Sequence, residues 1–136
     1  MTDEATRAID ALIDRYNACF NRQDFEGALA CYALPFTWIF SKARVSVSDE
    51  QQFLDTMRAT TGRLRAKGLA RSVFAEKHVR LLDAHVAVAS TLCIRYRADG
   101  TEMERVAGTY FLHENEGGWK LIACAGHPPE TMLPSA

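Results

Sequence analysis

The sequence predicts a single α+β domain in which three N-terminal helices pack on a strongly curved, mainly antiparallel sheet. Apolar residues recur at helical spacing through the N-terminal half of the chain, and an extended pattern replaces this spacing after Gly68. The length of 136 residues suits one hydrophobic core. We expect residues 1–136 to form one domain, shaped as a cone with an internal pocket.

The composition argues against two classes of binding partner, nucleic acids and membranes. Hydrophobic residues make up 48% of the chain, charged residues 24%, and the net charge is −1, which argues against nucleic acid as a partner. No stretch reaches the roughly 18 apolar residues that span a bilayer. The acidic start Met1-Thr2-Asp3-Glu4 lacks the basic opening of a signal peptide. We therefore expect a cytoplasmic protein that has no membrane partner.

The cysteines and the short motifs indicate no metal or cofactor. None of the four cysteines belongs to a C-x-x-C pair, so we expect reduced, buried thiols. The chain has no glycine-rich phosphate loop, no H-E-x-x-H motif and no serine on a glycine elbow.

Two helices are predicted first. An apolar stripe over residues 3–20 indicates the first one: Ala5, Ala8, Ile9, Leu12, Ile13, Tyr16 and Phe20. Asp24 is a suitable N-cap for a short second helix that should run through Tyr32. Pro35 prevents the continuation of this helix, because it lacks the backbone N–H.

A small hairpin and a third helix should follow. Residues 36–40 and 44–47 are β-prone and are separated by a short polar connection. Ser48 and Gln51 form a capping box that opens a helix carrying Phe53 and Met57. Gly68 marks the end of this helix.

Four long strands are predicted over residues 73–82, 85–97, 102–113 and 119–125. Asp99-Gly100 indicates a type I′ turn with positive φ at both positions. Gly108 is a candidate for a bulge within its strand. Strands of about 10 to 13 residues in a small sheet should curl over their own apolar face, and this curvature leaves room for a pocket.

Several short patterns carry a family resemblance. They are Tyr16-Asn17, Asn21-x-x-Asp24-Phe25-x-Gly27-Ala28-Leu29, Phe36-Thr37-Trp38 and Gly118-Trp119-Lys120-Leu121-Ile122. In this order they resemble the nuclear transport factor two-like superfamily, in its ketosteroid-isomerase and SnoaL-like branches, over nearly the whole chain. The superfamily includes enzymes, binding proteins and dimerisation modules, so the resemblance implies a fold and not a function.

The ketosteroid-isomerase resemblance implies three functional groups: a tyrosine on the first helix, a carboxylate base on the first strand and a protonated acid deep in the sheet. Tyr16 matches the tyrosine. The positions beside Phe40 and near Gly108 or Thr109 have no carboxylate. Abstraction of a carbon-bound proton needs an acceptor within reach, so we do not expect this isomerase activity.

Histidine and arginine leave two alternatives open. His127, at the end of the last strand, is the best candidate for an acid or base, although a structural histidine is also consistent with the sequence. If Arg105 points inward, it could bind an anionic ligand through two hydrogen bonds. It could instead form a surface pair with Glu102 or Glu104 near the turn.

The leading hypothesis is a protein that binds a small, largely apolar or aromatic molecule in the cone. The expected ligand-binding residues are Tyr16, Trp38, Phe40, Phe53, Met57, Arg105, Thr109 and His127. One alternative is a cofactor-free isomerase, dehydratase or cyclase with Tyr16 and His127 as catalytic residues. Another is a dimerisation module without a ligand.

The alternation in the strand over residues 85–97 predicts a homodimer. Its two faces carry Val86, Val88, Leu92, Ile94 and Tyr96 on one side, and Ala87, Ala89, Thr91, Cys93, Arg95 and Arg97 on the other. Both sets are apolar in the middle, and no further helix remains in the sequence to cover the outer face. We therefore expect a second copy of the chain to cover it.

Overall fold

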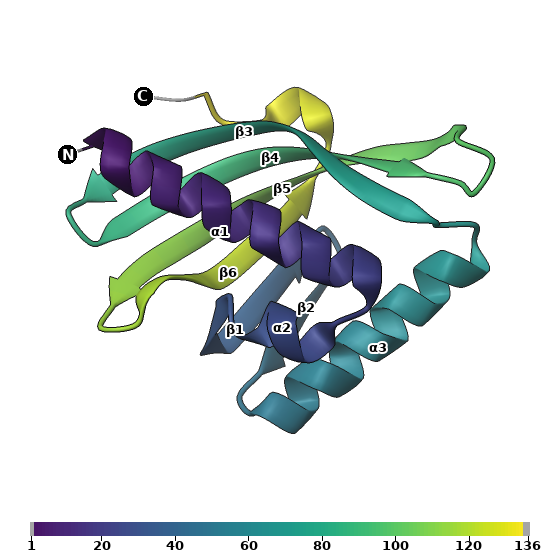
Figure 1. Cartoon of the computed structure of the whole chain (residues 1–136), viewed down its shortest axis with the longest axis horizontal. Coiled ribbons are helices and arrows are strands. Elements are labelled where there is room, and N and C mark those ends of the chain that lie inside the picture. The colour runs from purple at the N-terminus through teal and green to yellow at the C-terminus, as the bar shows by residue number, and fades with distance from the viewer. Residues whose placement is uncertain (1, 135–136) are drawn as a thin grey trace.

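The computed structural model of the chain describes residues 2–134 (Figure 1). In chain order the elements are α1 (Thr2–Arg22), α2 (Phe25–Leu29), β1 (Tyr32–Phe40), β2 (Ala43–Val47), α3 (Glu50–Ala66), β3 (Arg71–Asp83), β4 (Val86–Tyr96), β5 (Glu102–Asn115), β6 (Gly118–His127) and the 3-10 turn η1 (Pro129–Thr131). The predicted α+β class and the order of its elements are confirmed.

The six strands form one open sheet in the order β2-β1-β6-β5-β4-β3. Neighbours pair antiparallel, except that β1 runs parallel to β6. Helix α1 lies across this curved sheet, and α3 extends beyond its β1–β2 end (Figure 1). The β1–β2 pair is the hairpin expected from the sequence.

The two faces of the sheet differ, and β4 defines them. Ala87 and Ala89 belong to the main core together with Ile9 and Ile13 of α1, so they lie on the side of the helices. We call this side the concave face. Residues of the other parity, such as Val88, lie on the opposite side, which we call the outer face.

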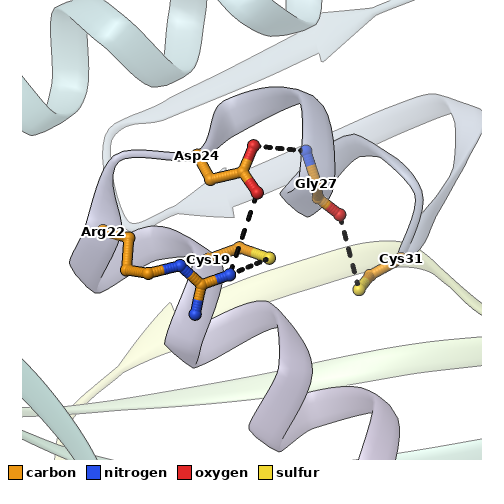
Figure 2. Close-up of polar contacts among 5 residues, drawn as sticks. All are labelled: Cys19, Arg22, Asp24, Gly27 and Cys31. Carbon is orange, nitrogen blue, oxygen red and sulfur yellow. Dashed lines mark hydrogen bonds and ion pairs between the residues drawn. The ribbon is translucent and has the colours of Figure 1, made fainter.

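The junction between α1 and α2 requires a close backbone approach at Gly27 (Figure 2). Asp24 is the N-cap of α2, as predicted, and its Oδ1 accepts a hydrogen bond of 2.9 Å from Gly27 N. A Cβ at Gly27 would lie 2.3 Å from Asp24 Oδ2 and 2.9 Å from Cys19 Sγ. A side chain therefore does not fit here, which is the physical reason for glycine in this pattern.

Helix α2 and strand β1 depart from the sequence prediction. The helix ends at Leu29, and β1 already begins at Tyr32, where a helix was expected. Tyr32 pairs with Leu121 of β6, and the register shifts before Thr37. Pro35 lies within this shift, where a missing N–H disrupts the pairing least. Long-range pairing with β6 thus overrides the local helical pattern.

Two smaller predictions about caps and turns were wrong in detail. The N-cap of α3 is Asp49 and not Ser48, because the Asp49 side chain accepts from Gln52 N. In the β4–β5 connection Gly100 has a φ of +88°, while Asp99 does not adopt a positive φ. The Asp99 carboxylate instead accepts hydrogen bonds from the backbone N–H and the hydroxyl of Thr101.

Gly108 does not form the expected bulge. It pairs in register with Thr91 of β4 and Gly126 of β6. The irregularities of β5 lie elsewhere, one near Glu102 and one between Phe111 and Leu112. Because Gly108 has no side chain, a space stays free on the concave face between Cys124, Tyr110 and Thr91. A Cβ at Gly108 would occupy this space and contact all three residues.

Candidate functional site

A pocket of about 590 Å³ lies between α1, α3 and the concave face of the sheet. Its lining consists of Tyr16, Asn17, Phe20, Trp38, Phe40, Val45, Thr56, Met57, Ala59, Thr60, Arg63, Leu64, Ser72, Phe74, Thr91, Cys93, Arg95, Val106, Ala107, Gly108, Tyr110, Cys124, Gly126 and His127. This volume is within the range of small-molecule sites, which is roughly 300–1,000 Å³. The structure therefore has a cavity of this size between its helices and its sheet.

Aromatic rings surround Tyr16 at the inner end of the pocket. The centroid of the Tyr16 ring lies 5.5 Å from that of Tyr32, 6.3 Å from that of Phe74 and 6.5 Å from that of Tyr110. The contacts with Tyr32 and Tyr110 are edge-to-face, the arrangement in which the electron-poor ring edge meets an electron-rich ring face. These contacts hold Tyr16 in place while its ring still borders the cavity.

Burial keeps these side chains neutral. It raises the pKa of Tyr16 to about 12 and the pKa of Cys124 to about 12, because the ionised forms lose their hydration. The pKa of Tyr110 is likewise raised well above its ordinary value by burial. Near neutral pH the inner pocket therefore offers O–H and S–H groups and no anion.

Besides the neutral tyrosine hydroxyls and cysteine thiols, the lining of the pocket contains only basic ionisable side chains. Arg63, Arg95 and His127 border the pocket, and within its lining there is no aspartate or glutamate. Phe40 and Gly108, the positions at which the sequence resemblance led us to look for carboxylates, carry none. The lining therefore supplies no carboxylate for proton abstraction from carbon.

The structure separates the predicted ligand-binding residues into two groups. Those that border the pocket are Tyr16, Trp38, Phe40, Met57 and His127. Phe53 is fully buried behind Trp38, with its ring stacked on the indole at 6.1 Å between centroids, so it supports the wall without lining it. Thr109 and Arg105 lie on the outer face, opposite Ser90 and Ile94 of β4. These two residues are not part of the pocket lining, so the inward orientation that a ligand contact of Arg105 or Thr109 would need is not the one that the structure has.

His127 borders the pocket, but both nitrogens of its ring contact threonine hydroxyls. Its Nε2 lies 2.6 Å from Thr109 Oγ1, and its Nδ1 lies 2.9 Å from Thr131 Oγ1 in the 3-10 turn. Both ring nitrogens are thus occupied on the outer face, while Tyr16 lies on the concave side. In this arrangement the His127 ring nitrogens are engaged by Thr109 and Thr131 and not by Tyr16.

The surface alternative for Arg105 is what the structure shows. Its guanidinium forms an ion pair with Glu102 in which Nε lies 2.9 Å from Oε2. The arginine that faces the pocket is Arg95, which also forms an ion pair with Glu104. The sequence had left the orientation of Arg105 open.

Other pocket residues were missed by sequence analysis. Tyr110, Cys124, Phe74 and Ser72 line the pocket without having been candidates. Alternation along the strand from Gly108 would have placed Tyr110 on the same face, so a signal for it existed. Ser72 has no such signal, because its position depends on the pairing of β3 with β4.

All four cysteines are free and buried, which confirms the prediction that they act as reduced, apolar side chains. No helix among residues 2–134 combines the length and the apolar character needed to cross a membrane.

Comparisons with known proteins agree with this fold. The family model described as NTF2-like protein (DUF6841) matches residues 3–129. An NTF2-like protein with a cystatin-like fold from Novosphingobium aromaticivorans has 16% identity and a TM-score of 0.76, covering 94% of this chain and 84% of that one. A protein of unknown function with a cystatin-like fold from Nostoc punctiforme has 13% identity and a TM-score of 0.75, covering 96% and 92%.

A third similar structure, from Xanthomonas campestris, is described as a calcium/calmodulin dependent protein kinase II association domain. It has 18% identity and a TM-score of 0.66, covering 92% of this chain and 89% of that one. No curated protein matches the chain. At these identities the structures show a common fold and no common function. Because the family model spans nearly the whole chain, the protein belongs to the NTF2-like family DUF6841.

Proposed function

We propose that this protein binds a small, largely apolar or aromatic molecule in the pocket between its helices and the concave face. The observation that carries the proposal is the cavity of about 590 Å³, walled by aromatic side chains with a few polar groups among them. A cavity of this size is costly in a small domain, because its lining loses packing contacts. A ligand that fills it restores these contacts.

Calorimetric titration with a neutral aromatic probe, 2-naphthol, tests the proposal. We expect saturable binding with one site per chain. The matched variants are Gly108→Val, which adds methyl groups among the pocket residues Thr91, Tyr110 and Cys124, and Ala75→Val, which adds methyl groups at an exposed position. Gly108→Val should weaken binding, and Ala75→Val should leave the affinity unchanged. An equal effect of both variants, or no binding of naphthyl probes at all, would refute the proposal.

A homodimer through the outer face is also part of the proposed function. An outer patch is formed by Ile39, Val88, Phe111, Ala123 and Ala125, which are cross-strand neighbours in β1, β4, β5 and β6. Ile39 is 43% exposed and Phe111 is 46% exposed, in the middle of the sheet and not at its edge. A second copy of the chain would bury this patch against its own equivalent.

Sedimentation at micromolar concentration tests this assembly. We expect the wild-type chain to sediment as a dimer and Phe111→Glu to sediment as a monomer, because a charge in the patch would be desolvated. Leu82→Glu is the matched control, since Leu82 is 54% exposed at the end of β3 and outside the patch. A monomeric wild-type protein would contradict the assembly.

A further inference from the structure

A polar corner interrupts the apolar wall of the pocket where β3 meets β4. Ser72 lies directly opposite Arg95 in the register of the two strands, and both residues line the pocket. Cys93, two residues before Arg95 on the same face, lies beside both side chains. Burial raises the pKa of the Cys93 thiol, so this neighbour is uncharged near neutral pH.

Two polar atoms of this corner have no hydrogen-bond partner. They are Arg95 Nε and Ser72 Oγ: both are buried, neither has a partner of good hydrogen-bond geometry among the described residues, and only the neutral Cys93 thiol, a weak hydrogen-bonding group, interacts with these two side chains. The Nη1 atom of Arg95 donates to Glu104 Oε2, so one side of the guanidinium is engaged. The remaining side carries Nε, and this edge of a guanidinium holds a carboxylate through two parallel hydrogen bonds. Buried polar groups are nearly always paired in folded proteins, so two such atoms on adjacent residues indicate a missing partner.

The backbone of the corner is held in place by α1. The Asn21 side chain accepts a hydrogen bond of 2.8 Å from Ser72 N, and its Nδ2 donates to Ser72 O at 2.9 Å. Asn17 Nδ2 also donates to Ser72 O, at 3.2 Å. These bonds satisfy backbone groups of β3, which is an edge strand, and they anchor the backbone that carries the Ser72 hydroxyl.

The charge of the pocket selects for an anion. Arg95 is offset by Glu104, but Arg63 at the rim forms no ion pair with an acidic side chain within residues 2–134. The lining itself has no carboxylate. Taken together, Arg63, Arg95 and Glu104 leave an excess of one positive charge beside the two unpartnered polar atoms.

We propose that the pocket recognises an aromatic or apolar carboxylic acid in its ionised form. The apolar part packs among the rings around Tyr16, and the carboxylate accepts hydrogen bonds from Arg95 Nε and from the Ser72 hydroxyl. This inference rests on the proposed ligand-binding function and narrows the class of ligand. The sequence suggested Arg105 as an anion-binding residue, and this proposal gives that role to Arg95.

The test compares two probes of nearly equal shape, 2-naphthoic acid and 2-naphthamide, by calorimetric titration. At about pH 7.5 the acid is fully ionised, and the amide is neutral. We expect the naphthoate to bind at least about tenfold more tightly than the amide, because hydrogen bonds to charged groups are the stronger ones. Equal affinities of acid and amide would overturn this inference and leave the proposed function standing. Failure of both probes and of 2-naphthol to bind would refute the proposed function itself.

Three variants locate the effect. Arg95→Met should abolish the preference for the acid, while Arg105→Met, which removes the equivalent arginine of the outer pair, should preserve it. Ser72→Ala removes a hydroxyl whose one polar neighbour among the described side chains is the weakly interacting Cys93 thiol, so it should fold normally and reduce the preference several-fold. An unchanged preference in Ser72→Ala and Arg95→Met would overturn the assignment. If Arg95→Met fails to fold, Ser72→Ala alone decides.

Discussion

The β4–β5 hairpin carries two arginine–glutamate pairs whose surroundings differ. Arg95 and Glu104 lie on the concave face, and the Arg95 side chain is only 22% exposed at the pocket wall. Arg105 and Glu102 lie on the outer face, where the Arg105 side chain is 52% exposed. In the outer pair the pKa of Glu102 is lowered and the pKa of Arg105 is raised, each by its partner. The same residue types thus form part of a pocket on one face and a solvated pair on the other.

The two faces also differ in how their buried hydroxyls are satisfied. On the outer face Ser90 Oγ accepts from Leu133 N and lies 2.9 Å from Thr109 Oγ1, which in turn contacts His127. On the concave face Thr91 Oγ1 donates to Gly108 O, whereas Ser72 Oγ, also at the pocket, is buried without a partner of good geometry among the described residues. A complete network stabilises a fold, whereas an incomplete one beside a cavity is typical of a binding site.

The largest expected effect is a difference in stability between substitutions at two adjacent residues of β5, whose side chains point to opposite faces of the sheet. Leu112→Ala removes a fully buried side chain on the concave side and should lower the free energy of unfolding by about 2–5 kcal/mol. Phe111→Ala removes a larger but half-exposed ring from the outer face and should cost less at concentrations where the chain is monomeric. Urea denaturation of both variants measures the difference. A larger loss for Phe111→Ala in the monomer would contradict the assignment of faces.

An intermediate effect should follow from the raised pKa of Tyr16. The folded pKa of about 12 lies above the ordinary value of 10.0, so the unfolded chain releases this proton first as pH rises. The stability linked to Tyr16 is therefore fully present below pH 10 and is lost between pH 10 and about pH 12. Over this interval it amounts to roughly 2 kcal/mol, reduced to the extent that pocket water reaches the phenol.

Tyr16→Phe should unfold with a shallower loss of stability between pH 10 and pH 12, as measured by denaturant titration at several pH values. The control is the same pair of proteins at about pH 8, where both states of Tyr16 are protonated and this contribution does not change with pH. Identical slopes in the alkaline interval would show that Tyr16 titrates normally in the folded protein.

The smallest effect should distinguish two serines of the outer face. Ser90 is fully buried and joins Leu133 to Thr109, so Ser90→Ala should cost about 1–2 kcal/mol and expose the C-terminal segment to proteolysis. Ser46 makes a similar bond of 2.9 Å to Thr37 Oγ1 at an exposed position, and Ser46→Ala should cost less. Equal losses would mean that burial does not strengthen the outer network.

Local patterns were sufficient for most elements of the fold. The stripe of α1, the Asp24 cap and the four long strands follow from apolar periodicity and turn chemistry, which act over a few residues. The errors occur where contacts between segments far apart in the sequence determine the local structure. Tyr32 belongs to a strand because it pairs with Leu121, and the C-terminal segment packs on the outer face because Leu133 N bonds to Ser90.

The candidate site was predicted in part for the same reason. Tyr16, Trp38 and Met57 border the pocket as expected, because a residue on the buried face of a helix or strand beside the cavity has few other places to point. Phe53 was assigned to the ligand although it supports Trp38 from behind. The aromatic residues of a sequence predict that a pocket wall is aromatic. They do not predict which rings line the pocket and which rings pack behind that lining.

By itself, the sequence determined the class of fold, the order of its elements and a hydrophobic core large enough to leave room for a cavity. Tertiary structure alone decided which face each strand residue occupies. A shift of one residue in register exchanges the faces, and this register is set by pairing partners far away in the chain. That choice places Arg95 and Ser72 at the pocket, and Arg105 and Thr109 outside it.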